Sequence, residues 1–133
     1  MNELGKVGAL VGRIFLGFIF ILSGLMKVMG PGGTAAYMVA SGFPEGIAPP
    51  LAFLAGALEL VGGLMIAAGM RARLAALVLF LFLIPTTIIF HMIPGGQMNQ
   101  ISTLKNFAIM GGLLILATQG GGGFSLDDRR AAA

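Results

Sequence analysis

Six polar residues lie within or beside long apolar stretches of this sequence, and their side chains could bind a ligand or move a proton. They are Arg13, Lys27, Glu59, His91, Lys105 and Asn106. A carboxylate and an imidazole can accept and donate protons, so Glu59 and His91 are the candidate catalytic residues. The ammonium groups of Lys27 and Lys105 and the amide of Asn106 can donate hydrogen bonds to a carbonyl or an anion. These three are the candidate residues for binding a substrate or a quinone-like headgroup.

The composition indicates which elements must position these residues. Of the 133 residues, 57% are hydrophobic and 10% are charged, and the mean hydropathy is +0.98. An ordinary soluble domain carries about 25% charged residues, and a globule of this size could not bury so much apolar surface. The sequence therefore predicts an all-α membrane protein, a bundle of helices in contact with the lipid bilayer.

Several kinds of chemistry are excluded by residue types that the sequence lacks. There is no cysteine and only one histidine, which excludes disulfide exchange, iron–sulfur ligation and cysteine-based zinc sites within one chain. We therefore expect no metal and no covalent cofactor. The polar residues could hold either a quinone-like or an anionic headgroup. The eight Lys and Arg residues are scattered, so the net charge of +3 does not indicate nucleic-acid binding.

Four apolar stretches predict a bundle of four transmembrane helices, at about residues 7–28, 49–69, 74–93 and 104–118. The first is long enough to cross a hydrocarbon core of about 30 Å, and the last is short unless the polar residues before it extend the helix. The short connection at 69–73 makes the second and third spans antiparallel neighbours. Residues 1–119 thus form a single transmembrane domain, and the glycine-rich segment 120–133 is predicted to be a flexible cytoplasmic tail.

The placement of charge predicts the orientation in the membrane. With four spans, both termini and the 69–73 turn lie on one side, which collects the basic residues Lys6, Arg71, Arg73, Arg129 and Arg130. The positive-inside rule puts that side, with both termini, in the cytoplasm. The loop at 30–46 then faces outward, and residues 35–41 can form a short helix at the membrane interface.

Two opposite charges are predicted at similar depth in the bundle. If the first helix starts near Gly5 and the second ends near Met70, Arg13 lies about 12 Å and Glu59 about 16 Å from the cytoplasmic side. Each charge alone is costly in hydrocarbon, so we expect Arg13 and Glu59 to form a structural ion pair. Such a pair could serve only to set the helix register, or it could also relay protons.

A second group of polar residues is predicted near the outer face. Lys27 ends the first span, His91 lies near the top of the third, and Lys105 and Asn106 open the fourth. Together they could hold an anionic or quinone-like headgroup, with an apolar tail between the helices. The alternative is that Lys27 and Lys105 extend toward the lipid headgroups and that His91 is an ordinary interfacial residue.

These residues recur in motifs whose order and spacing match a known pattern. The motifs are Arg13-Ile-Phe-Leu-Gly17, Ser23-Gly24-Leu-Met-Lys27, Glu59-Leu-Val-Gly62-Gly63, Gly69-Met-Arg71-Ala-Arg73, His91, Lys105-Asn106 and Gly111-Gly112. From about residue 7 to 118 the chain resembles the DoxX family of small four-helix bacterial membrane proteins. The resemblance implies a multi-pass protein of the bacterial inner membrane. It also implies a link to quinone-dependent thiosulfate oxidation, to membrane oxidoreductase complexes and to oxidative or thiol stress.

Three hypotheses for the function remain open. The first is a membrane subunit of a quinone-linked oxidoreductase or redox-stress system, which binds a quinone or an anionic donor near the outer face. The second is an assembly or scaffold subunit without chemistry of its own. The third, a small transporter, has little support, because inverted repeats are not evident. We expect a protein partner or a second copy of the chain, and any thiol chemistry would belong to a partner or a substrate, since this chain has no cysteine.

Overall fold

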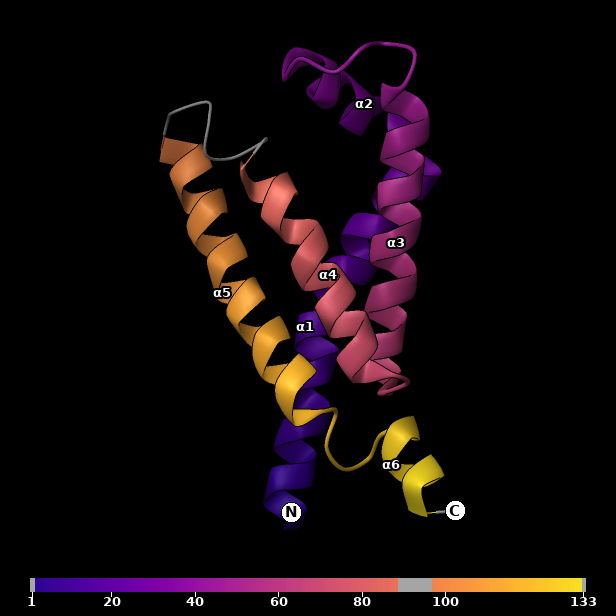
Figure 1. Ribbon diagram of the computed structural model, residues 1–133, viewed down its shortest axis with the longest axis vertical. Helices are drawn as coiled ribbons and strands as arrows, with labels where there is room; N and C mark the ends of the chain where they lie inside the picture. Colours follow the sequence, from indigo (N-terminus) through magenta and orange to yellow (C-terminus); the bar gives the residue numbers. More distant parts are fainter. Residues whose placement is uncertain (1, 89–96, 133) are drawn as a thin grey trace.

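The computed structural model describes residues 2–88 and 97–132 and contains six helices within that range (Figure 1). They are α1 (Glu3–Met29), α2 (Pro31–Ala40), α3 (Ala48–Ala68), α4 (Ala72–Thr87), α5 (Gln97–Gln119) and α6 (Leu126–Ala132). The described residues contain no strand, so the predicted all-α class is confirmed. The long helices α1, α3, α4 and α5 form a bundle, with α2 across one end and α6 at the other (Figure 1).

Three of these helices are long and apolar enough to cross a membrane, namely α1, α3 and the Gln100–Gln119 part of α5. The polar residues before the predicted fourth span do extend it, because α5 already begins at Gln97. The described part of α4 is apolar but has 16 residues, so at about 24 Å it is shorter than a hydrocarbon core of about 30 Å. Three of the predicted spans therefore coincide with helices that are long and apolar enough to cross a membrane, and a bundle of four spans stays a prediction.

The antiparallel helices α1 and α3 make the most extensive helix contact in the described chain. Gly24 lies against Gly56, and a Cβ atom on Gly24 would come 2.5 Å from the Gly56 carbonyl oxygen. Seven residues away on each helix, a Cβ atom on Gly17 would come 2.7 Å from the Gly63 carbonyl oxygen. Only glycine lets two backbones approach this closely, a form of packing that is common between membrane helices. These four glycines set the register of α1 against α3.

An apolar core lies inside the bundle. Ile66, Leu79 and Leu113, from α3, α4 and α5, are fully buried in it, and Phe20 of α1 packs against them. Many other large apolar side chains of the same helices are exposed on the outside of the bundle. An apolar outer surface on helices of this length indicates contact with a lipid bilayer rather than with water.

The short helix expected at residues 35–41 is present as α2, which begins four residues earlier, at Pro31. Pro31 occupies its first turn, where the missing N–H group would have no partner within the helix. Ala35 and Met38 are buried against Ala48 and Ala52 of α3. Small side chains on both helices let α2 lie close to α3, so that α2 packs at this end of the bundle on the side of α1 and α3 (Figure 1).

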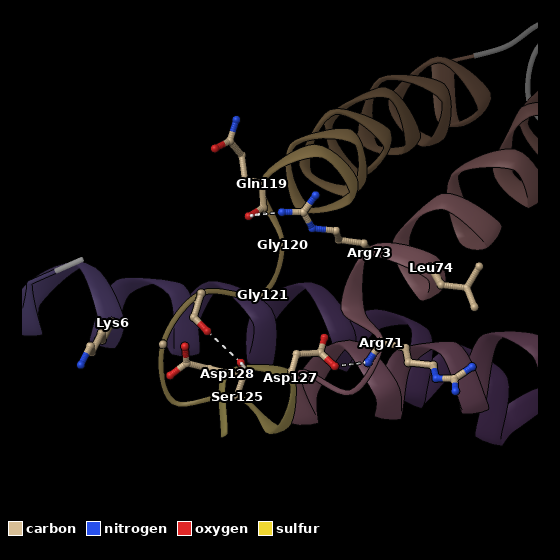
Figure 2. A pocket seen from close by; sticks show the side chains of 12 residues that line it. Lys6, Arg71, Arg73, Leu74, Gln119, Gly120, Gly121, Ser125, Asp127 and Asp128 are labelled. Atoms are coloured by element: carbon tan, nitrogen blue, oxygen red, sulfur yellow. Dashed lines mark hydrogen bonds between the residues drawn. The ribbon is translucent and has the colours of Figure 1, made fainter. Parts of the chain in front are cut away.

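The segment after α5 differs from the flexible tail that the sequence predicts. It contains α6 and folds back on the turn between α3 and α4 (Figure 2). The Asp127 carboxylate accepts hydrogen bonds from the backbone N–H groups of Arg71 (2.7 Å) and Ala72 (2.9 Å) at the start of α4. The first N–H groups of a helix lack partners within it, so Asp127 caps α4. Local sequence could not predict this contact, because Asp127 and Arg71 are 56 positions apart.

Candidate functional site

Lys27 of α1 and Glu59 of α3 form an ion pair inside the bundle. The Lys27 ammonium group donates a hydrogen bond to Glu59 Oε1. The side chain of Glu59 is 5% exposed and that of Lys27 is 23% exposed, so both charges are largely enclosed by protein. Charged side chains in a membrane bundle usually face its interior and pair with one another, which is the arrangement seen here.

The close approach of α1 and α3 brings these two side chains together. A Cβ atom on Gly56 would come 2.6 Å from the Cβ atom of Lys27, so Lys27 lies level with Gly56. Glu59 follows Gly56 by three residues, so it is offset from Lys27 by about 4.5 Å along the antiparallel helices. Side chains on an α-helix tilt toward its N-terminus. On these antiparallel helices, Lys27 and Glu59 therefore tilt toward each other, which closes the offset.

The predicted ion pair between Arg13 and Glu59 is not formed, because each side chain has other partners. The buried Arg13 guanidinium donates to the carbonyl oxygens of Ala67 (2.9 Å) at the end of α3 and of Phe124 (2.7 Å) in the tail. The prediction assumed that α1 begins at about the level where α3 ends. Instead α1 begins at Glu3 and extends beyond α3, so Arg13 lies level with the last turn of α3, about two turns from Glu59.

The Lys27–Glu59 pair lines a cavity of about 180 Å³ inside the bundle, which we call the polar cavity. Its polar lining residues come from four helices and are Ser23, Lys27, Glu59, Thr86, Lys105 and Asn106. Four predicted site residues, Lys27, Glu59, Lys105 and Asn106, therefore line one cavity, whereas Arg13 does not. Asn106 is buried, and its amide nitrogen donates to the Thr87 hydroxyl oxygen at 3.0 Å, which joins α5 to α4.

The lining residues give the polar cavity an excess of positive charge. Lys27 and Lys105 contribute two positive charges and Glu59 one negative charge, a formal net charge of +1. Glu59 is already paired with Lys27, and Lys105 forms no ion pair within the described part of the chain. An electron-rich oxygen atom is therefore the ligand group that would best complement the cavity.

Some site residues were not accessible to sequence reasoning. Phe82 and Leu83 also line the polar cavity, but an apolar residue within an apolar helix carries no distinguishing signal. The sequence does contain one pattern that relates to the Lys27–Glu59 pair, because Gly24 and Gly56 each precede a charged residue by three positions.

His91 lies outside the described residues, so its role stays a prediction. Within those residues, no group of three or more His, Cys, Asp or Glu side chains could hold a metal ion.

The fold and the site define a small helical membrane protein with a polar cavity enclosed by apolar helices. Residues 8–92 match the sequence model of the DoxX family, and the chain belongs to that family. The resemblance inferred from the motifs is thereby confirmed.

Three similar proteins extend this comparison. Inner membrane protein YqjF of Escherichia coli (strain K12) is 40% identical over 127 residues, which cover 96% of this chain and 95% of YqjF. Inner membrane protein YphA of the same organism is 35% identical over 90% of this chain and 88% of its own. A Bacillus subtilis (strain 168) protein named "Putative oxidoreductase CatD" is 32% identical over 63% of this chain and 60% of its own. No solved structure matches the chain.

Proposed function

We propose that this protein is a membrane subunit of a quinone-linked oxidoreductase or redox-stress system. In this proposal the polar cavity binds the headgroup of a quinone or an anionic electron donor. The observation that carries the proposal is that Lys27, Glu59, Lys105 and Asn106, which lie on three helices, line a single cavity. The name of the relative CatD, which includes the word oxidoreductase, agrees with this class of function.

The chemical groups of the polar cavity suit a quinone headgroup. A quinone carbonyl accepts hydrogen bonds, and Lys27, Lys105 and Asn106 carry ammonium or amide groups that donate them. Phe82 and Ile109 provide apolar wall for the ring. A bound quinone would supply an acceptor for two electrons and two protons, and the electrons would come from a partner protein or a substrate.

Each residue has a proposed role. Lys27 donates a hydrogen bond or a proton to the ligand, and Glu59 holds the Lys27 ammonium group in place and exchanges protons with it. Lys105 and Asn106 orient the headgroup by hydrogen bonds. His91 is proposed as a second proton carrier. The apolar side chains in its wall lower the local dielectric, which strengthens the electrostatic interactions within the polar cavity.

The test compares quinone binding by wild-type protein and two variants in mild detergent. Native mass spectrometry and titration with a short-chain benzoquinone would measure bound ligand. Lys105→Ala should weaken binding at least tenfold, equivalent to about 1.4 kcal/mol, because it removes a donor from the polar cavity. Arg73→Ala removes an exposed cation at the opposite end of the bundle and should leave binding unchanged. Equal binding by all three proteins, or binding by none, would contradict the proposal.

An assembly subunit without chemistry is the second candidate function. It is favoured by the polar pairs Lys27–Glu59 and Asn106–Thr87, in which buried groups satisfy each other. It is also favoured by a groove of about 430 Å³ between α1, α5 and the segment after α5, whose wall is mainly apolar and includes Gly12. A Lys105→Ala protein that stays assembled with its partner but loses function would exclude this candidate.

We also propose that α4 makes a fourth crossing and that both termini lie in the cytoplasm. The start of α1, the turn between α3 and α4, and α6 lie at the same end of the bundle (Figure 1). Lys6, Arg71, Arg73 and Arg129 gather at that end, which the positive-inside rule assigns to the cytoplasm.

A further inference from the structure

A second and larger cavity adjoins the polar cavity. It has a volume of about 490 Å³ and is bounded by α1, α2, α3 and α4, so we call it the α2 chamber. Its walls are mainly apolar and include Met38, Phe43, Phe82 and Pro85. Lys27 is the one charged residue among its described lining residues.

The docking of α2 on α3 creates this chamber. Ala35 of α2 is buried against α3, while Gly33 and Thr34 on the same helix line the chamber. On the α4 side, the Thr86 hydroxyl donates a hydrogen bond to the backbone carbonyl oxygen of Phe82 at 2.8 Å. That proton is therefore engaged within α4, and the Lys27 ammonium group is the strongest donor available to a molecule in the chamber.

Three residues, Lys27, Phe82 and Thr86, line both the polar cavity and the α2 chamber. Small-molecule sites commonly have volumes of about 300 to 1,000 Å³. The α2 chamber, at about 490 Å³, lies within this range, whereas the polar cavity, at about 180 Å³, is below it. The polar cavity can therefore hold a small polar group, and the rest of a larger ligand needs the adjoining space.

We infer that the α2 chamber binds the apolar body of an amphipathic ligand whose electron-rich polar end enters the polar cavity. Lys27, at the junction, contacts the ligand where its polar and apolar parts meet. The positive charge of the polar cavity selects the polar end, and the walls of the α2 chamber, which lack any other charge among the described lining residues, require an uncharged body. The inference rests on the proposed function and deepens it, because it makes α2 the element that selects the ligand by its apolar part.

Two adjacent glycines of α2 provide matched variants. A Cβ atom on either Gly32 or Gly33 would meet nothing within 4 Å, and neither residue has a positive φ, so the backbone at neither position opposes a side chain. Gly33 lines the α2 chamber, whereas Gly32 does not. Gly33→Leu therefore fills part of the chamber, and Gly32→Leu adds the same group outside it. Leucine favours helix more than glycine does, so both variants should fold.

The experiment uses two benzoquinones that share the dimethoxy-methyl ring, one without a tail and one with a decyl tail. Binding is measured by titration with native mass spectrometry in one detergent, so that partitioning is the same for every variant. We expect Gly33→Leu to weaken binding of the decyl compound at least tenfold and to leave the tail-free ring unaffected. Gly32→Leu should bind both compounds as the wild type does.

The outcomes separate this inference from the proposed function. If the ring binds to the wild type but Gly33→Leu and Gly32→Leu bind the decyl compound equally, the inference is overturned and the proposed function stands. If decyl binding depends on Gly33 but neither compound is affected by Lys105→Ala, the chamber is supported and the proposed headgroup site is contradicted. If neither compound binds to the wild type, both are overturned.

Discussion

The Lys27–Glu59 ion pair lies beside the Gly24–Gly56 contact, where the backbones of α1 and α3 touch. The contact between α1 and α3 therefore has two effects. It holds the bundle together, and it places the Lys27 ammonium group where the polar cavity meets the α2 chamber. The stability of the bundle and the chemistry of the site are coupled at this point. Variants there should be measured for both stability and ligand binding.

Removing Glu59 should destabilise the protein. In Glu59→Ala the Lys27 ammonium group keeps its enclosed position but loses its counter-charge, and we expect the free energy of unfolding to fall by about 3 kcal/mol. Denaturant or thermal unfolding in a fixed detergent measures this change. The double variant Lys27→Met/Glu59→Leu removes both charges and should recover most of the loss. If Glu59→Ala alone is as stable as the wild type, the ion pair does not contribute to folding.

Adding a methyl group at Gly24 should separate α1 from α3. The new Cβ atom would lie 2.5 Å from the Gly56 carbonyl oxygen, so the backbones must move apart, at a cost of about 1 to 3 kcal/mol. The same substitution at Gly8, where a Cβ atom would meet nothing within 4 Å, is the control and should be neutral or slightly stabilising. Equal melting temperatures for Gly24→Ala and Gly8→Ala would contradict the close contact.

Weakening the Asp127 cap should loosen the start of α4. Asp127→Asn replaces a charged acceptor by a neutral one that can bond only one of the two N–H groups well, and we expect a loss of about 1 kcal/mol. Hydrogen exchange at the amides of Arg71 and Ala72 should become faster. Asp128→Asn, which changes an exposed carboxylate next in the chain, serves as the control. Unchanged exchange in Asp127→Asn would mean that the tail does not protect α4 in solution.

The proposed topology can be tested with single cysteines, because the natural chain has none. A membrane-impermeant maleimide applied to spheroplasts should label Ser41→Cys, after α2, and Gln100→Cys, in the first turn of α5. It should label Asp128→Cys only after lysis. Labelling of Gln100→Cys only after lysis would show that α4 does not cross the membrane. If Ser41→Cys and Gln100→Cys are labelled only after lysis and Asp128→Cys is labelled before it, the protein has the opposite orientation and both termini lie outside.

The amino-acid sequence by itself determined that the chain is helical, that it contacts lipid and where most helices lie. Apolar runs and their lengths are local properties, so α1 and α3 were predicted to within a few residues. The convergence of Lys27, Lys105 and Asn106 at one depth also followed from their positions along the spans. These features needed no knowledge of how one helix packs on another.

Only the tertiary structure decided which polar groups meet. Sequence shows that a charge within a membrane helix needs a partner, but it does not show the rotation or the relative height of the helices. Packing of glycine on glycine set that height, so Glu59 meets Lys27, and Arg13 instead bonds to carbonyl oxygens of α3 and of the tail, up to 111 positions away. The α2 chamber likewise exists because α2 docks on α3 through small buried side chains, and that contact is a property of two surfaces rather than of either segment alone.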